Sequence, residues 1–128
     1  MNKLIIDVVG EKIFLMIITS SNIYNITYEN TKINYEKLTK LINDFLISYN
    51  LTISDISTIY VNKGPGSFAG IRNSLSTVKA FNVAKKIDYY CYSLDDFEGE
   101  IDVRYENIPD LCKKYKIKKN LINPVYIS

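Results

Sequence analysis

The sequence predicts an α/β fold, in which helices pack on a mixed five-stranded sheet and the elements follow the order βββαβαβ. Three apolar segments separated by tight turns are typical of an antiparallel meander. Two segments with helical spacing of apolar residues follow, and a short apolar segment comes after each of them. The predicted strands are 3–9, 12–19, 23–29, 56–61 and 87–94, and the predicted helices are about 35–50 and 71–86.

The two predicted helices differ in the number of faces that can pack against other elements. In the first, Asn34 is a good N-cap and Glu36 lies in the first turn. The apolar positions of this helix form one stripe, made of Leu38, Leu41, Ile42, Phe45, Leu46 and Tyr49. In the second helix, Ile71, Leu75 and Val78 share one face. Small and apolar residues lie roughly opposite, namely Ser76, Thr77, Ala80, Val83 and Ala84. Such a helix packs on two sides, either inside its own domain or against a partner.

Composition narrows the class of protein. The 128 residues suffice for one domain, and a net charge of +2 is too balanced to indicate nucleic-acid binding by itself. Histidine is absent, so the commonest metal ligand and general base are missing. Cys91 and Cys112 do not form a metal or disulfide motif, and we expect both to be reduced core residues. The N-terminus has no secretion-signal pattern and the longest apolar run is six residues, so we expect a soluble cytoplasmic protein without a membrane segment.

The segment after residue 94 is rich in charge. Residues 95–106 carry six acidic side chains against Arg104, and residues 113–119 carry five lysines. We interpret these as two solvated surface segments that attract each other. A short helix is predicted near Pro109, and residues 123–128 are predicted to end as an edge strand.

The most informative stretch lies between the fourth predicted strand and the second predicted helix. It reads Gly64-Pro65-Gly66-Ser67-Phe68-Ala69-Gly70-Ile71-Arg72. Glycines on both sides of a proline indicate a sharp, stiff turn, and Ser67 is placed to cap the helix that follows. Free backbone N–H groups at a helix start could hold a phosphate. However, the loop lacks the lysine and Ser/Thr pair of a Walker motif, so a purely structural turn is favoured over phosphate binding.

This nine-residue motif resembles the GPGSFTGIR signature of the TsaB (YeaZ) family, and it occurs at the same place between strand and helix. Two weaker matches flank it in the family's order. Leu4-Ile5-Ile6-Asp7 resembles the first strand, and Pro124-Val125-Tyr126-Ile127 resembles the closing segment. The resemblance implies an RNase H-like fold of the actin and Hsp70 type over residues 1–94. Residues 95–128 are then a reduced tail in place of most of the C-terminal subdomain.

The resemblance implies a non-catalytic partner subunit in the threonylcarbamoyladenosine modification of tRNA. The expected partner is a TsaD-like protein in a heterodimer, which a TsaE-like ATPase can join, and tRNA is contacted only indirectly. The isolated chain forming a homodimer remains an alternative. The resemblance implies no catalytic residue, cofactor or metal. Val8 and Val9 replace the hydroxyl residues that follow the first-strand aspartate in related ATPases, and Ala69 replaces a threonine.

Two further interpretations complete the prediction. The alternative function is a nucleotide-binding or hydrolytic module that uses Asp7 and the Gly64–Gly70 loop. On a buried first strand, Asp7 is more readily interpreted as a structural or relic residue. If the chain is a partner subunit, the two helices carry the contact. The candidate interface residues are Leu38, Phe45, Tyr49, Leu75, Ala80 and Phe81.

Overall fold

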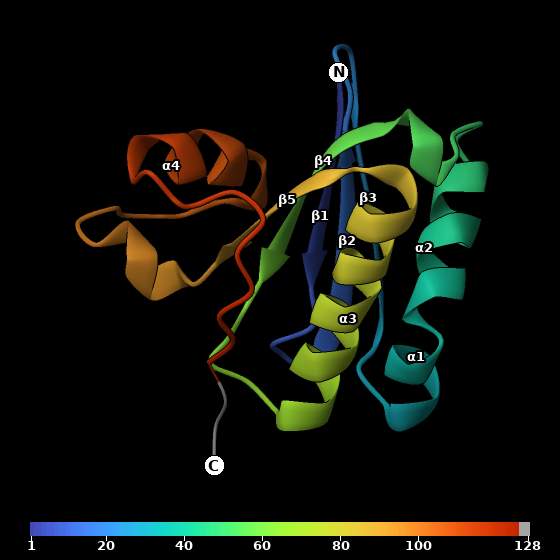
Figure 1. Cartoon of the computed structure of the whole chain (residues 1–128), viewed down its shortest axis with the longest axis horizontal. Coiled ribbons are helices and arrows are strands. Elements are labelled where there is room, and N and C mark those ends of the chain that lie inside the picture. Colours follow the sequence, from blue (N-terminus) through green and yellow to red (C-terminus); the bar gives the residue numbers. More distant parts are fainter. Residues whose placement is uncertain (126–128) are drawn as a thin grey trace.

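The sheet has five strands in the order β3-β2-β1-β4-β5. A computed structural model describes residues 1–125 of the chain (Figure 1). The strands are β1 (Asn2–Asp7), β2 (Lys12–Ile18), β3 (Ile23–Glu29), β4 (Ile56–Asn62) and β5 (Asp88–Tyr92). The first three form an antiparallel meander, whereas β4 pairs in parallel with β1 and β5 pairs in parallel with β4. The predicted mixed sheet and the βββαβαβ order are confirmed.

The first predicted helix is two helices, α1 (Lys32–Glu36) and α2 (Leu38–Ile47). The N-cap prediction for Asn34 is wrong, because Thr31 caps α1 by accepting the Asn34 backbone N–H at 3.4 Å. The Asn34 side chain instead donates to the Glu29 carbonyl at 2.8 Å, which fastens α1 to the end of β3. The chain leaves helical geometry at Lys37 and re-enters it at Leu38, so the helix breaks there.

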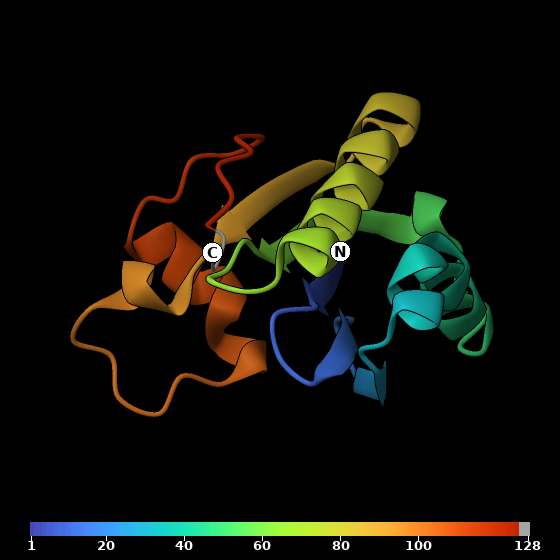
Figure 2. The ribbon, with the colours of Figure 1, turned by 90° about the horizontal axis from the view of Figure 1, so that it is seen from below.

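The helix α3 (Phe68–Lys85) begins three residues before its predicted start, with Ser67 at the N-cap position. Its Ile71-Leu75-Val78 face is buried. Together with α1 and α2 it covers one face of the sheet, where Leu4, Ile6, Leu15 and their neighbours form the larger core. Figure 2 shows this helical layer on one side of the sheet and the C-terminal segment on the other.

Residues after β5 pack on the second face of the sheet and form a smaller core, while the charged side chains of segments 95–106 and 113–119 are exposed or half-buried, as predicted. Phe97 and the helix α4 (Ile108–Lys114) supply the apolar side chains. The buried members of this core are Ile5, Met16, Tyr60, Tyr92, Phe97, Ile108, Leu111 and Cys112. Four of these residues come from the C-terminal part of the chain, and three of them, Ile108, Leu111 and Cys112, lie between the two charged segments. The predicted attraction holds at one pair, where Lys114 Nζ lies 2.6 Å from Glu100 Oε2.

The short helix predicted near Pro109 is α4, with proline in its first turn. The predicted closing strand falls partly on residues 126–128, which lie outside the described residues. Residues 123–125 are not in a strand, but the Val125 N–H donates to the Lys63 carbonyl at 2.8 Å. In the described part of the chain, no helix is long and apolar enough to cross a membrane.

Candidate functional site

The loop from Gly64 to Gly70 joins β4 to α3, and its glycines are required by close packing. Gly64 has a φ of +117°, and a Cβ added there would lie 2.0 Å from the Val125 carbonyl oxygen. At Gly66 an added Cβ would lie 2.9 Å from Ile71 Cδ1 and 3.3 Å from the Val9 Cα. The loop is therefore held between the turn after β1 and the segment around Val125. This geometry agrees with a structural turn.

The start of α3 leaves the outer side of the motif exposed. Ser67, Phe68 and Arg72 are exposed, while Gly70 and Ile71 are buried. The Ser67 side chain makes no capping hydrogen bond. The Arg72 guanidinium lies over the Phe68 ring, 5.7 Å from its centroid, in a cation–π contact. Pro65 is also exposed and follows a cis Gly64–Pro65 peptide bond.

Asp7 lies at the end of β1, is only 8% exposed, and accepts hydrogen bonds with both carboxylate oxygens. The Val9 N–H donates to Oδ1 at 2.9 Å. The Asn62 side-chain amide and the Tyr105 hydroxyl donate to Oδ2 at 3.1 Å and 2.8 Å. These donors come from the turn after β1, the end of β4 and the C-terminal segment. The carboxylate is therefore occupied by groups of its own chain.

Asn62 connects this carboxylate to the glycine loop. Its side-chain oxygen accepts the Gly64 N–H at 3.0 Å, while its amide nitrogen donates to Asp7. One buried asparagine thus fixes both the direction of the Asp7 carboxylate and the first residue of the loop. Sequence reasoning missed this residue. Its position at the end of a strand that neighbours β1 is the signal that could have found it.

Two tyrosines close the site on the side of the second core. Burial, the charge of Asp7 and its hydrogen bond all raise the pKa of Tyr105, so its hydroxyl stays protonated and donates at neutral pH. Burial raises the pKa of Tyr92 well above its usual value, with smaller contributions from Asp7 and Tyr105. The buried Tyr92 hydroxyl has no hydrogen-bond partner among the described residues. Both tyrosines were missed at the sequence level, because no motif marks them.

The space beside Asp7 is small. A cavity of about 140 Å³ is bordered by Asp7, Arg104, Tyr105 and three apolar residues, whereas pockets for drug-sized ligands and cofactors usually measure about 300–1,000 Å³. Among residues 1–125, no group of three or more His, Cys, Asp or Glu side chains could hold a metal ion. The arrangement around Asp7 is thus a packed polar junction between three segments.

The six candidate interface residues divide into two groups. The structure places Leu38, Phe45, Leu75 and Phe81 in the chain's own core, which makes them unavailable as surface anchors. The helical spacing identified them as apolar but did not indicate which face contacts the sheet. Tyr49 and Ala80 are exposed. Tyr49 stacks on Tyr24 with ring centroids 3.9 Å apart, so Ala80 is the candidate that lies open on α3.

Solved structures share this fold. YeaZ from Pseudomonas aeruginosa superposes with a TM-score of 0.66 and 18% sequence identity over 72% of this chain, and a protein described as similar to peptidase YEAZ, also from P. aeruginosa, gives the same values. Thermus thermophilus RuvC in complex with a Holliday junction substrate superposes with a TM-score of 0.52 and 9% identity, over 77% of this chain and 68% of RuvC. These likenesses establish an RNase H-like fold.

The chain is short beside these relatives, since it spans 43% of the length of the YeaZ structures. Comparison with curated proteins finds no match. The family model described as "TsaD: tRNA N6-adenosine threonylcarbamoyltransferase" matches residues 30–99, a stretch that runs from α1 through the glycine loop and α3 to the residues after β5. Because this match covers more than half of the sequence, the chain belongs to the TsaD family, and its fold is that of a shortened YeaZ.

Proposed function

We propose that this protein is a non-catalytic partner subunit that supports a TsaD-like protein in the threonylcarbamoyladenosine modification of tRNA. The observation that carries the proposal is the state of Asp7. A catalytic carboxylate needs a free oxygen directed at a substrate. Here both oxygens accept hydrogen bonds from the chain itself, and the cavity beside them holds only about 140 Å³. Family membership supports the link to tRNA modification.

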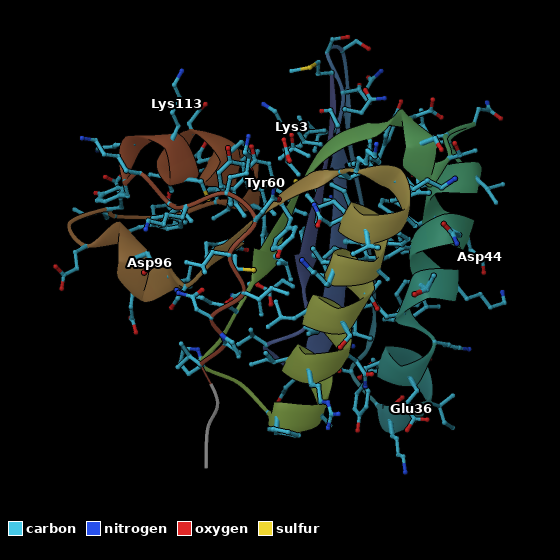
Figure 3. The ribbon with its side chains drawn as sticks, in the orientation of Figure 1. Lys3, Glu36, Asp44, Tyr60, Asp96 and Lys113 are labelled. Atoms are coloured by element: carbon cyan, nitrogen blue, oxygen red, sulfur yellow. The ribbon has the colours of Figure 1, made fainter. Side chains whose placement is uncertain are left out.

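The surface that we assign to the partner is the outer side of the helical layer. Five large apolar side chains on or next to these helices are exposed although the chain has a complete core, and exposed apolar patches are typical of interaction surfaces. They are Ile33, Ile47, Tyr49, Phe68 and Val83. Figure 3 shows the helical layer from its edge and labels Glu36 on α1 and Asp44 on α2.

A shallow apolar groove runs along α3 within this surface. It measures about 540 Å³, and Ala80 forms part of its floor. The groove is bordered by Arg72, Leu75, Ser76, Lys79, Ala80, Val83, Ile122 and Pro124. Small residues such as Ser76 and Ala80 allow a partner helix to approach closely, while the exposed Val83 supplies apolar contact. The occupant that we propose is a helix of the TsaD-like protein, which would form a heterodimer with this chain.

Other members of such a complex follow from this arrangement. A TsaE-like ATPase would join the pair rather than bind this chain alone, and tRNA would contact the TsaD-like protein. A homodimer through the same helical surface would form when the TsaD-like protein is absent, because the apolar groove would then be covered by a second copy. Co-purification from cytoplasm with a tagged chain tests the proposal, and recovery of a TsaD-like protein is the expected outcome.

The alternative is a nucleotide-hydrolysing module that uses Asp7 and the Gly64–Gly70 loop. Val8 and Val9 offer no hydroxyl to a phosphate, and the loop is packed against Val9 and Val125. We therefore predict that the isolated protein does not hydrolyse ATP above the buffer control in the presence of magnesium. Phosphate release that is lost in the Asp7→Asn variant would establish the alternative.

A further inference from the structure

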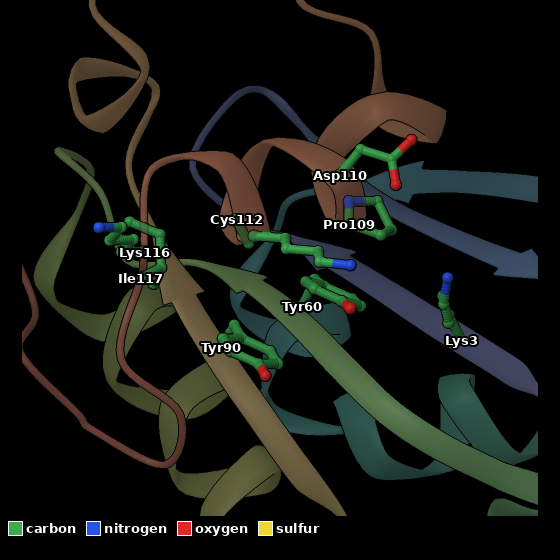
Figure 4. A pocket seen from close by; sticks show the side chains of 9 residues that line it. Lys3, Tyr60, Tyr90, Pro109, Asp110, Cys112, Lys116 and Ile117 are labelled. Carbon is green, nitrogen blue, oxygen red and sulfur yellow. The ribbon is translucent and has the colours of Figure 1, made fainter.

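A second cavity lies on the opposite face of the sheet from the proposed partner surface. It measures about 460 Å³, within the usual size range of small-molecule sites. The sheet and the segment around α4 form its walls (Figure 4). It is lined by Lys3, Tyr60, Tyr90, Pro109, Asp110, Cys112, Lys113, Lys116 and Ile117. None of these residues belongs to the glycine loop or to the Asp7 junction.

The cavity carries an excess of positive charge that the chain does not neutralise. Lys3, Lys113 and Lys116 line it, and none of the three has an ion-pair partner among residues 1–125. The single carboxylate on its wall, Asp110, is also unpaired in the described part of the chain. Figure 4 shows Lys3 and Lys116 at opposite ends of the cavity. Three lysines against one carboxylate make the cavity attractive to an anion.

Other lysines of the same segment form ion pairs with nearby carboxylates. Lys114 is the next residue along α4 and lies 2.6 Å from Glu100, and Lys119 lies 3.6 Å from Asp88. Both therefore have a partner, whereas Lys113 and Lys116 line the cavity without one. Lys118 also has no ion-pair partner in the described residues but lines another pocket, so two of the three unpaired lysines of this segment border the cavity.

Two stacked tyrosines form the floor. Tyr60 on β4 and Tyr90 on β5 are register partners, with ring centroids 5.3 Å apart and planes inclined by 11°. Burial raises the pKa of Tyr60 to about 12, with smaller contributions from Cys112, Tyr90 and Asp110, so this phenol is neutral and able to donate. Neither hydroxyl hydrogen bonds to another side chain in the described residues. Phenol donors and ammonium groups around one cavity suit phosphate oxygens.

We propose that this cavity binds the phosphate of a nucleotide, either free in solution or within an RNA strand. Lys3, Lys113 and Lys116 supply the charge and Tyr60 supplies a hydrogen bond. The remaining walls, formed by the tyrosine rings, Pro109 and Ile117, are apolar and suit a flat base. The cavity exceeds the size of inorganic phosphate, which points to an organic ligand. The inference does not depend on the proposed partner role, since the two surfaces lie on opposite faces of the sheet.

The test is an NMR titration of the whole chain, labelled with nitrogen-15, with four probes: AMP, adenosine, inorganic phosphate and a single-stranded RNA decamer. AMP should shift the amide resonances of residues around Lys3, Tyr60, Tyr90 and α4, and adenosine should bind at least several-fold more weakly. If the decamer binds and AMP does not, the source of the phosphate is RNA; if AMP binds as well as the decamer, it is the free nucleotide. Absence of shifts with both phosphorylated probes, or shifts confined to the Gly64–Gly70 loop, would overturn the proposal.

Substitutions locate the site. Lys113→Gln should weaken phosphate-dependent binding roughly three- to tenfold, as expected for the loss of one charge contact. Lys114→Gln removes the same charge from the adjacent position but leaves the cavity intact, so it should change the affinity by less than about twofold. Tyr60→Phe keeps the ring and removes the donor, and it should weaken AMP without affecting adenosine. Equal effects of Lys113→Gln and Lys114→Gln would show non-specific attraction and contradict the proposal.

Discussion

Asp7 ties together three parts of the chain that are distant in the sequence. Its carboxylate contacts the turn after β1, Asn62 at the end of β4, and Tyr105 in the C-terminal segment. A buried carboxylate that lost these donors would remain desolvated and unpaired, which typically costs several kcal/mol. At the end of its first strand, this chain therefore uses a carboxylate to fix the loop and the tail.

The first residue-scale prediction concerns Gly64. An alanine there would place its Cβ 2.0 Å from the Val125 carbonyl and would have to adopt a φ of +117°. We expect Gly64→Ala to lower the free energy of unfolding by at least about 2 kcal/mol, measured by urea denaturation.

Gly10→Ala is the matched control, because no atom lies within 4 Å of an added Cβ and φ is not positive there. We expect this control to stay within about 0.5 kcal/mol of the parent protein. Equal stability of the two variants would mean that Val125 does not pack on the loop.

The second residue-scale prediction concerns thiol chemistry. Burial raises the pKa of Cys91 to about 12 and is the main cause of the same shift at Cys112. Since the thiolate is the reactive form, both cysteines should react slowly with a disulfide reagent at pH 8 in the native protein and rapidly in urea.

The sign of the pH dependence follows from these raised values. Below about pH 9 both states hold their thiol protons, so the contribution to stability is fully present. Between about pH 9 and 12 the unfolded chain releases protons that the folded chain retains, and stability should fall as the pH rises. Rapid native labelling of both thiols at pH 8 would show that the larger core around Cys91 and the second core around Cys112 both open readily.

At the scale of elements, the C-terminal segment completes the fold by covering the second face of the sheet. Ile108 on α4 is almost completely buried against this face. We expect Ile108→Ala to lower the free energy of unfolding by about 2–4 kcal/mol, as is usual when a buried isoleucine is truncated.

Ile101→Ala serves as the control, because Ile101 is 92% exposed in the same segment. Its effect should be within about 0.5 kcal/mol. If Ile108→Ala were equally harmless in thermal or urea unfolding, the packing of residues 95–125 on the sheet would contribute little to the free energy of unfolding.

These elements also show what the sequence could and could not predict. Alternation in residues 23–29 predicted β3, and the apolar spacing in the helices predicted that Ile71, Leu75 and Val78 share one face, because one-face burial leaves a period in the sequence. The second core leaves a weaker signal. Ile108 and Leu111 share one face of the short helix α4, Phe97 lies in a separate turn, and their common target is visible only once β1, β4 and β5 lie side by side.

The same limit applies to the candidate sites. The glycine motif was predicted to be a structural turn, and its packing agrees with that interpretation. Its contact with Val125 could not be predicted, because nothing local to either segment encodes the approach of a carbonyl from sixty residues away. Likewise, helical spacing selected apolar residues such as Phe45 and Phe81 but did not distinguish core from interface.

At the scale of the whole molecule, one sheet separates an apolar surface from a positively charged one. The outer side of the helical layer is apolar along α3, whereas the cavity beside α4 is lined by unpaired lysines. The chain spans 43% of the length of the YeaZ structures. We propose that the apolar surface of the helical layer makes its main contact with the partner.

The central claim is that α3 binds a TsaD-like protein, and the most direct test is a titration of that protein from the same organism against three forms of this chain. Ala80 is exposed opposite the buried Ile71-Leu75-Val78 face, so Ala80→Glu should remain folded, with an unchanged unfolding midpoint. In the complex its carboxylate would be buried in the apolar groove, and we expect the affinity to fall at least tenfold, or about 1.4 kcal/mol. Ile101→Glu adds the same charge on the opposite side of the molecule and should bind like the parent chain. Tight binding that Ala80→Glu leaves unchanged, or no binding by the parent chain, would contradict this account.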